Sequence, residues 1–153
     1  MKEKKPLKKF NYRFEKVLSF KKHLEKQKQR ELAEAIAFEQ KQKQEILAVL
    51  DDRSNHQLQE KKFLTGKIDG NLLTRYSRYY MKLKQMEING RELLANIKEE
   101  VGKRHEKLVG ATKQRKIYEK LKERHLDRHT NELKLLLQKE NDEIGQTMFF
   151  RNK

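Results

Sequence analysis

Two histidines one helical turn apart are the pair of side chains in this sequence whose spacing comes closest to a metal site. His125 and His129 stand at i and i+4 in RHLDRH, so a helix would present both imidazoles on one face. A bound metal ion needs further ligands, and no carboxylate–histidine motif accompanies the pair. Arg124 and Arg128 beside them also disfavour a cation. We therefore expect no metal at this position.

A second segment, TGKIDG at residues 65–70, contains the Gly-Lys pair of a phosphate-binding loop. It lacks the upstream glycine, the Ser or Thr after the lysine and the preceding strand that such a loop requires. Elsewhere the sequence holds no carboxylate pair, Ser–His set or glycine-rich strand turn of a catalytic site. Thin paired helices also provide no concave pocket that excludes water. The sequence therefore predicts a protein that is not an enzyme and binds no cofactor or small molecule.

The elements that carry these residues follow from the composition. Of the 153 residues, 35% are apolar and 40% are charged, which is too little apolar surface for a compact two-layer domain. Helix-forming Lys, Glu, Gln and Leu dominate and the only proline is Pro6, so long helices are favoured over disorder. This mixture is typical of a coiled coil. Cysteine is absent, so neither a disulfide nor thiolate chemistry is expected.

Turn-forming residues cluster in LTGKIDGN and divide the chain. We expect Gly66 near the C-cap of a first helix and Asp69 or Asn71 as the N-cap of a second. The predicted fold is all-α and forms one domain, an antiparallel two-helix coiled-coil hairpin whose second helix is longer than the first. Its expected parts are a basic leader, a first helix, a turn, a second helix and a C-terminal tail, at residues 1–12, 13–63, 64–71, 71–145 and 146–153.

Heptad spacing predicts which residues face the partner helix. On the first helix they are Phe14, Val17, Leu18, Leu24, Leu32, Ala35, Ile36, Ile46, Val49 and Leu50, with polar interruptions at Lys28 and Gln42. On the second they are Tyr76, Tyr79, Leu83, Met86, Leu93, Ile97, Ala111, Tyr118 and Leu121, with Gly90, Glu100, Arg104 and Gln114 as weak members. A fold point near Lys67 makes residue i face roughly residue 135 − i.

At the open end of the hairpin, four residues are expected to form an apolar clamp between the helices: Phe14, Val17, Tyr118 and Leu121. Phe10 and Tyr12 precede it as an extended or fraying lead-in. The longer second helix should project past the clamp with exposed apolar residues, among them Leu133, Leu136, Leu137 and Ile144. Exposed apolar side chains in number mark a partner site. A segment that curls back or frays is the alternative interpretation.

The tyrosines after the turn and the glycines inside the second helix each allow two interpretations. Tyr76 and Tyr79 in RYSRYYMKL are either anchors of a partner interface or part of a broad layer that closes the coil near the turn. Gly90, Gly102 and Gly110 lie inside the second helix, where each costs roughly 1 kcal/mol relative to alanine. These glycines either let the helix bend or allow the two helices to approach closely.

The net charge of +15 is concentrated at the N-terminus, where residues 1–30 hold twelve Lys and Arg against three Glu. Such an end favours an acidic partner. Interleaved acidic residues and the internal turn disfavour a parallel basic zipper, so no specific nucleic acid is expected. A nucleic-acid-associated coiled coil and a dimerising scaffold remain the rival hypotheses. No apolar run approaches the roughly 20 residues that span a bilayer, and no signal-peptide core follows the basic start, so a cytoplasmic location is expected.

Three segments together resemble one known family. FNYRFEKVLSFKKHLEKQKQRELAEA resembles the start of FliJ proteins of bacterial flagellar type III export, and TRYSRYYMKL resembles their aromatic segment after the turn. The stretch RKIYEKLKERHLDRHTNELKLLLQKENDEI is similar to their C-terminal part. The order and spacing of these segments carry the resemblance. The internal glycines and the strong basicity depart from the family pattern.

The resemblance implies a two-helix stalk at the flagellar base, peripheral to the inner membrane. Its expected partners are the hexameric export ATPase, the membrane export gate and substrate-specific export chaperones. The positions that match the gate-contacting face are Tyr76, Tyr79, Leu83 and Met86, with Gly90 a poor match. The exposed helical end, with Leu133, Leu136, Leu137 and Ile144, is the expected contact with the ATPase ring.

Overall fold

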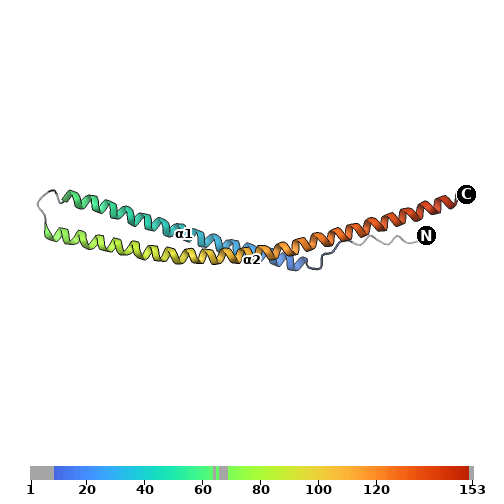
Figure 1. Ribbon diagram of the computed structural model, residues 1–153, viewed down its shortest axis with the longest axis horizontal. Coiled ribbons are helices and arrows are strands. Elements are labelled where there is room, and N and C mark those ends of the chain that lie inside the picture. The colour runs from blue at the N-terminus through green and yellow to red at the C-terminus, as the bar shows by residue number, and fades with distance from the viewer. Residues whose placement is uncertain (1–8, 64, 66–68, 152–153) are drawn as a thin grey trace. The chain divides into compact units, whose positions relative to one another are not determined.

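The computed structural model describes residues 9–63, 65 and 69–151, which form two α-helices. Helix α1 spans Glu15–Phe63 and helix α2 spans Gly70–Arg151 (Figure 1). The all-α fold of two packed antiparallel helices, the second longer, is confirmed. Contacts group these residues into two compact units. We call residues 26–109 the turn unit, and residues 9–25 with 110–151 the terminal unit.

Both ends of α1 and the start of α2 lie within two residues of the predicted positions. Helix α1 begins where the Glu15 N–H donates to the Tyr12 carbonyl over 3.1 Å, two residues later than expected. At the start of α2, Asp69 Oδ1 accepts from the Asn71 N–H at 2.9 Å, so Asp69 is the N-cap. The predicted C-cap, Gly66, lies outside the described residues.

The C-terminal end of α2 differs from the expectation of a separate tail at 146–153. The helix passes through Gly145 and continues to Arg151. No proline follows Gly145, whose own cost of about 1 kcal/mol cannot end a long helix. The Thr147 hydroxyl donates to the Glu143 carbonyl over 2.8 Å and so adds to the helical turn there. Residues 152 and 153 lie outside the described part.

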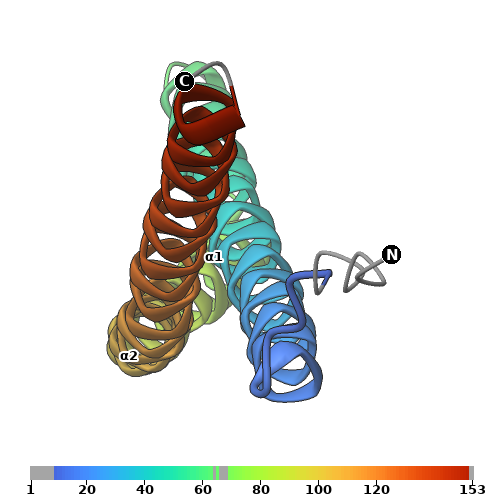
Figure 2. The same ribbon diagram turned by 90° about the vertical axis from the view of Figure 1, so that its right-hand side faces the viewer.

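Within the turn unit the helices lie side by side in both views (Figures 1 and 2). The residues between them recur at alternating steps of three and four, as in a heptad repeat. Those of α1 are Lys28, Leu32, Ala35, Glu39, Gln42, Ile46, Val49, Arg53, His56 and Glu60. Those of α2 are Tyr76, Tyr80, Leu83, Glu87, Gly90, Leu94, Ile97, Val101, Arg104 and Leu108. All are buried or half-buried, and we call them the seam.

The seam corrects half of the positions predicted on α2. Each heptad of α2 contributes two residues to the seam. The position that includes Leu83 and Ile97 was predicted correctly, and both residues are buried, but the second position lies one residue later than expected. Tyr80, Glu87 and Leu94 are half-buried, whereas the predicted residues are exposed by 41–47%: Tyr79, Met86 and Leu93. An apolarity pattern misses Glu87 because a carboxylate occupies the seam, where Arg53 of α1 pairs with it.

The seam of α1 is continuous where interruptions were expected. Lys28 is half-buried and Gln42 is only 7% exposed, so both are seam residues, while Ile36 turns outward. Gln42 tolerates this position because Gly90 faces it. A Cβ on Gly90 would stand 3.1 Å from Ile46 Cγ1 and 3.4 Å from Gln42 Nε2. Gly90 therefore serves close helix approach, whereas a Cβ on Gly102 would meet nothing within 4 Å.

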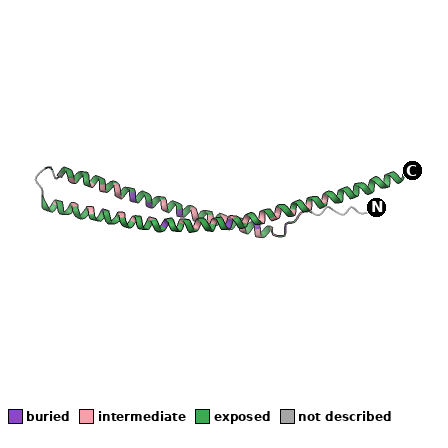
Figure 3. Cartoon of the chain, viewed as in Figure 1, coloured by how far each residue is buried: buried purple, intermediate pink, exposed green. Residues whose placement is uncertain are grey.

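The terminal unit continues the same heptad steps. Lys21 Nζ donates to Gln114 Oε1 over 2.5 Å, the opposition that the predicted register requires. Leu18 and Ala111 are buried between the helices, and Arg115, Tyr118 and His125 are half-buried along α2. Beyond Leu133, all residues of α2 to Arg151 are exposed (Figure 3).

Candidate partner-binding surfaces

An aromatic cluster joins the lead-in of the terminal unit to α2. The Tyr12 side chain is 4% exposed, and its hydroxyl donates to the Tyr118 carbonyl over 3.0 Å. Its ring stands edge-on to His125 and to Phe14, with centroids 5.9 Å apart in each pair. Burial raises the pKa of the Tyr12 phenol, and the Glu15 carboxylate adds to that rise. Tyr12 is thus a core residue rather than a fraying lead-in.

The histidine pair takes part in the same cluster. The His129 ring lies 5.5 Å from the Phe10 ring, one helical turn beyond the contact of His125 with Tyr12. Among the residues that the structure describes, no group of three or more potential ligands could hold a metal ion. The i, i+4 spacing of the two histidines therefore provides an aromatic platform for the lead-in.

The residues predicted as a clamp lie beside this cluster. The Phe14 ring contacts the Tyr118 ring with centroids 6.3 Å apart, and Val17 and Leu121 are half-buried. Sequence reasoning missed Tyr12 as a member. The signal was the alternation of aromatic residues at 10, 12 and 14, which an extended segment uses to place successive rings on a neighbouring helix.

Ion pairs flank the clamp. Arg115 Nε stands 2.5 Å from Glu25 Oε2, an ion pair whose N–H is poorly aligned for a hydrogen bond, and the guanidinium also pairs with Glu119. The hydrogen bond from Arg115 lowers the pKa of the Glu119 carboxyl. Lys122 Nζ bonds Glu15 Oε2 over 2.6 Å. These contacts fix the register of the helices at the clamp.

The C-terminal part of α2 presents an apolar surface. Leu133 is half-buried, whereas the other three predicted ring-contact residues are exposed by 46–55%: Leu136, Leu137 and Ile144. Four more apolar side chains follow the same pattern, at 58–74% exposure: Leu135, Met148, Phe149 and Phe150. The helix does not curl back over this surface, because α2 remains helical to Arg151.

The aromatic segment after the turn is divided between the seam and the surface. Tyr76 and Tyr79 both lie on the His56 ring, at centroid distances of 4.6 and 4.9 Å. The Tyr79 hydroxyl donates to Asp52 Oδ2 over 3.3 Å, and the nearby Asp52 charge raises the pKa of that phenol. Leu83 is only 3% exposed. Of the four predicted gate-contacting residues, Tyr79 and Met86 are therefore the ones available at the surface.

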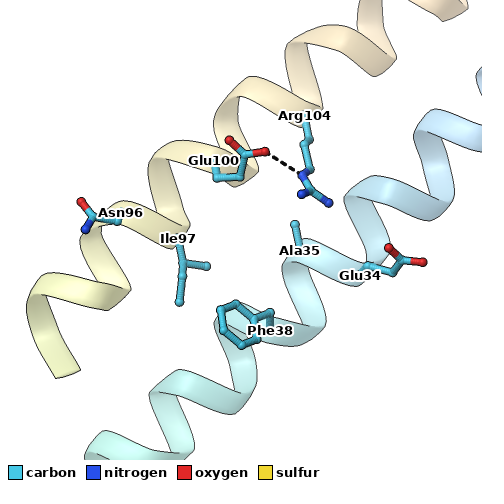
Figure 4. Close-up of a pocket in the computed structure, with 7 residues that line it drawn as sticks. All are labelled: Glu34, Ala35, Phe38, Asn96, Ile97, Glu100 and Arg104. Atoms are coloured by element: carbon cyan, nitrogen blue, oxygen red, sulfur yellow. Dashed lines mark hydrogen bonds and ion pairs between the residues drawn. The ribbon is translucent and has the colours of Figure 1, made fainter.

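A shallow groove opens on the Tyr79 side of the turn unit (Figure 4). Ala35 and Ile97 form its floor, and the half-exposed Phe38 ring stands beside them. At one end Arg104 bonds Glu100 over 2.9 Å and also donates to the Glu31 carbonyl across the seam over 2.8 Å. The hydrogen bond from Arg104 lowers the pKa of the Glu100 carboxyl.

In the part of the chain that the structure describes, no helix is both long and apolar enough to cross a membrane.

Comparisons with known proteins give one match, to a family model. Neither the curated proteins nor the solved structures include a match to this chain. The family model described as flagellar FliJ protein matches residues 10–153, nearly the whole chain. The chain therefore belongs to the FliJ family of non-enzymatic flagellar proteins, and membership implies a role related to flagellar export.

Proposed function

We propose that this protein is a stalk and adaptor of the flagellar type III export apparatus. It engages the hexameric export ATPase ring with the end of α2 and links the ring to the membrane export gate and to substrate chaperones. It works on the cytoplasmic side of the inner membrane, at the flagellar base. The apolar surface at the end of α2 carries this proposal.

The physical argument concerns residues 134–151, a single helix that is exposed along its whole length. At about 1.5 Å per residue it is roughly 27 Å long, enough to enter a narrow opening that a helix pair would not fit. Its exposed Leu, Ile, Met and Phe side chains favour burial, each by about 1.5–3 kcal/mol when covered completely. A ring of subunits that surrounds the helix can cover all of its sides at once.

A truncation tests this role. Removal of residues 134–153 leaves Leu133 and every contact of the aromatic cluster in place, so helicity per residue should stay unchanged by circular dichroism. The truncated protein should no longer stimulate the purified export ATPase. The variant Leu137→Ser/Ile144→Ser should lose most of the stimulation, whereas Lys134→Ser/Gln138→Ser in the same stretch should keep it. Full stimulation by the truncated protein would contradict the stalk assignment.

The gate contact is tested separately. Tyr79 and Met86 project from the same side of α2, seven residues apart, so Tyr79→Ser/Met86→Ser should weaken binding to the soluble domain of the gate protein. Met81, at 61% exposure, lies on the opposite side of the seam and provides the matched control Met81→Ser. Equal binding by both variants would remove the gate contact from this surface while leaving the ATPase contact intact.

A further inference from the structure

The two flanks of the seam in the turn unit differ in charge. In heptad letters, position a includes Ile46 and Leu94 and position d includes Ala35 and Ile97, so positions b and e lie on one flank and c and g on the other. In an antiparallel pair the e positions of both helices meet on one side and the g positions on the other. The g-flank contact of Tyr79 with Asp52 follows this rule.

We call positions b and e of both helices within residues 26–109 the basic face. Its charged residues are all cations: Lys26, Lys43, Lys61, Lys84, Arg91 and Lys98. Its large apolar residues are Ile36, Leu47, Leu50, Met81, Ile88 and Val109. No carboxylate of α1 or α2 in this unit occupies a b or e position. Five of them lie on the opposite flank, at positions c and g: Glu31, Glu34, Glu45, Asp52 and Glu100.

A groove runs along the basic face between the two helices. Leu47 and Leu50 of α1 and Leu94 of α2 line it, with Ile46 at its floor. Lys43 and Arg91 stand at its rim, one from each helix. Lys43 Nζ is 2.7 Å from Glu39 and Arg91 Nη2 is 2.8 Å from Glu87, and these seam carboxylates hold the cations in place. Leu47 and Ile88 are 63% and 43% exposed beside the groove.

The spacing of the face matches a third helix laid along the first two. On α2 the b positions recur every seven residues as Met81, Ile88, Ala95, Gly102 and Val109. A helix packed on a two-helix groove needs such a heptad repeat, with small residues where the backbones approach. Gly102 has open space around it, and Ala95 is exposed.

We propose that the basic face binds an amphipathic helix of a partner protein, whose apolar stripe is flanked by carboxylates. The apolar stripe would occupy the groove, and its acidic flanks would meet the cations of both helices. No b or e position carries a carboxylate, and among the described residues only Lys43 and Arg91 of the six cations are paired, with the seam carboxylates Glu39 and Glu87. An anionic lipid surface has the same negative charge as an acidic helix. Because it is flat, however, it would not fill a groove whose walls repeat every seven residues. The proposal does not depend on the export role.

A synthetic peptide of 21 residues, with Leu at a and d and Glu at e and g, is a direct probe. Binding of the fluorescein-labelled peptide to the full chain is measured by anisotropy at nanomolar peptide concentration. Two variants should each weaken binding at least about tenfold: Lys84→Glu/Lys98→Glu and Leu47→Ser/Ile88→Ser. All four residues are exposed, so circular dichroism should show unchanged helicity in both variants.

Matched control substitutions on the other flank distinguish binding by the basic face from attraction by the net charge of the chain. Lys82→Glu and Phe38→Ser change an exposed cation and an exposed ring there, and should alter the affinity by less than about twofold. The same peptide with Lys in place of Glu should not bind. Equal losses on both flanks, or binding of the Lys peptide, would overturn the proposal. Tighter binding to phosphatidylglycerol vesicles than to the peptide, or self-association through Leu47 in sedimentation, would also overturn it.

Discussion

The terminal unit and the turn unit hold the same pair of helices together in different ways. In the terminal unit, aromatic rings from a non-helical lead-in wrap onto α2, and Tyr12 is buried to 4% exposure. In the turn unit the seam alternates apolar residues with polar ones, and even Gln42 is buried. The first unit gains burial from a third segment, whereas the second has two helices only.

This difference teaches how a chain with few apolar residues distributes its stability. Two helices alone bury one narrow stripe, so large side chains such as Phe38 and Leu47 remain more than half exposed in the turn unit. Some polar seam residues there pair across the seam, as Arg53 does with Glu87 and Arg104 with the Glu31 carbonyl. The lead-in lets the terminal unit bury the Tyr12 ring, and a buried ring contributes more than an ion pair of the seam.

Acidification should have the largest effect, because it acts on all carboxylates at once. Lys28 lowers the pKa of Glu31, Arg104 that of Glu100 and Arg115 that of Glu119, all below the ordinary 4.5. A lowered folded pKa contributes stability that is complete above about pH 4.5 and is lost as the pH falls through the folded value. The melting temperature should therefore vary little between pH 7 and pH 5 and should fall steeply at lower pH.

The two units should respond to acid in order. Hydrogen exchange at pH 3.5 should show the turn unit losing protection before the terminal unit, because the terminal unit keeps the buried Tyr12 ring when its own ion pairs, such as that of Arg115 with Glu119, are lost. Added salt at neutral pH is a milder control that should produce the same order. Earlier loss of protection around Tyr12 would contradict the comparison.

Removal of the Tyr12 ring is expected to cost the most among single substitutions. Tyr12→Ala should lower the free energy of unfolding by about 3 kcal/mol in urea denaturation, since a buried ring and its packing are lost. Tyr12→Phe removes only the hydrogen bond to the Tyr118 carbonyl and should cost about 1 kcal/mol. The exposed Phe20 gives the control Phe20→Ala, with little expected change. Equal effects at 12 and 20 would rule out the clamp.

Substitution of the buried amide in the turn unit should stabilise the protein, in contrast to the loss of the Tyr12 ring. Gln42→Leu replaces a polar side chain by an apolar one of similar size and should raise the free energy of unfolding by about 1 kcal/mol. Gln44→Leu, one half-turn away and exposed, serves as the control and should be neutral. A destabilised Gln42→Leu protein would mean that the amide makes contacts worth more than its burial costs.

The smallest expected effects concern the two glycines that face different surroundings. Gly102→Ala places a Cβ in open space and should stabilise by about 0.5–1 kcal/mol through helix propensity. Gly90→Ala places a Cβ 3.1 Å from Ile46 Cγ1, so the gain in propensity should be offset by the displaced side chain. Melting temperatures compare the pair directly. An equal gain at both positions would show that the helices separate easily at Gly90.

Much of the architecture was accessible from residue patterns. The turn residues, the absence of proline after Pro6 and the heptad steps predicted two antiparallel helices, and the register predicted that Lys21 lies opposite Gln114. The exposed apolar end of α2 followed from the difference in helix length. The second seam position of α2 was wrong because Glu87 occupies it, and apolarity cannot reveal a charged residue that is paired across an interface.

The candidate surfaces were likewise predictable only in part from the sequence. The sequence by itself predicted that Leu136, Leu137 and Ile144 lie beyond the first helix, because the fold point near Lys67 places residue 13, the expected start of that helix, opposite residue 122. Only the tertiary structure decided that Leu83 belongs to the seam while Tyr79 and Met86 face outward, and that one flank of the turn unit carries cations alone. The physical reason is that a helix offers several possible stripes, and the charges and contours of the opposing helix select the one that is buried.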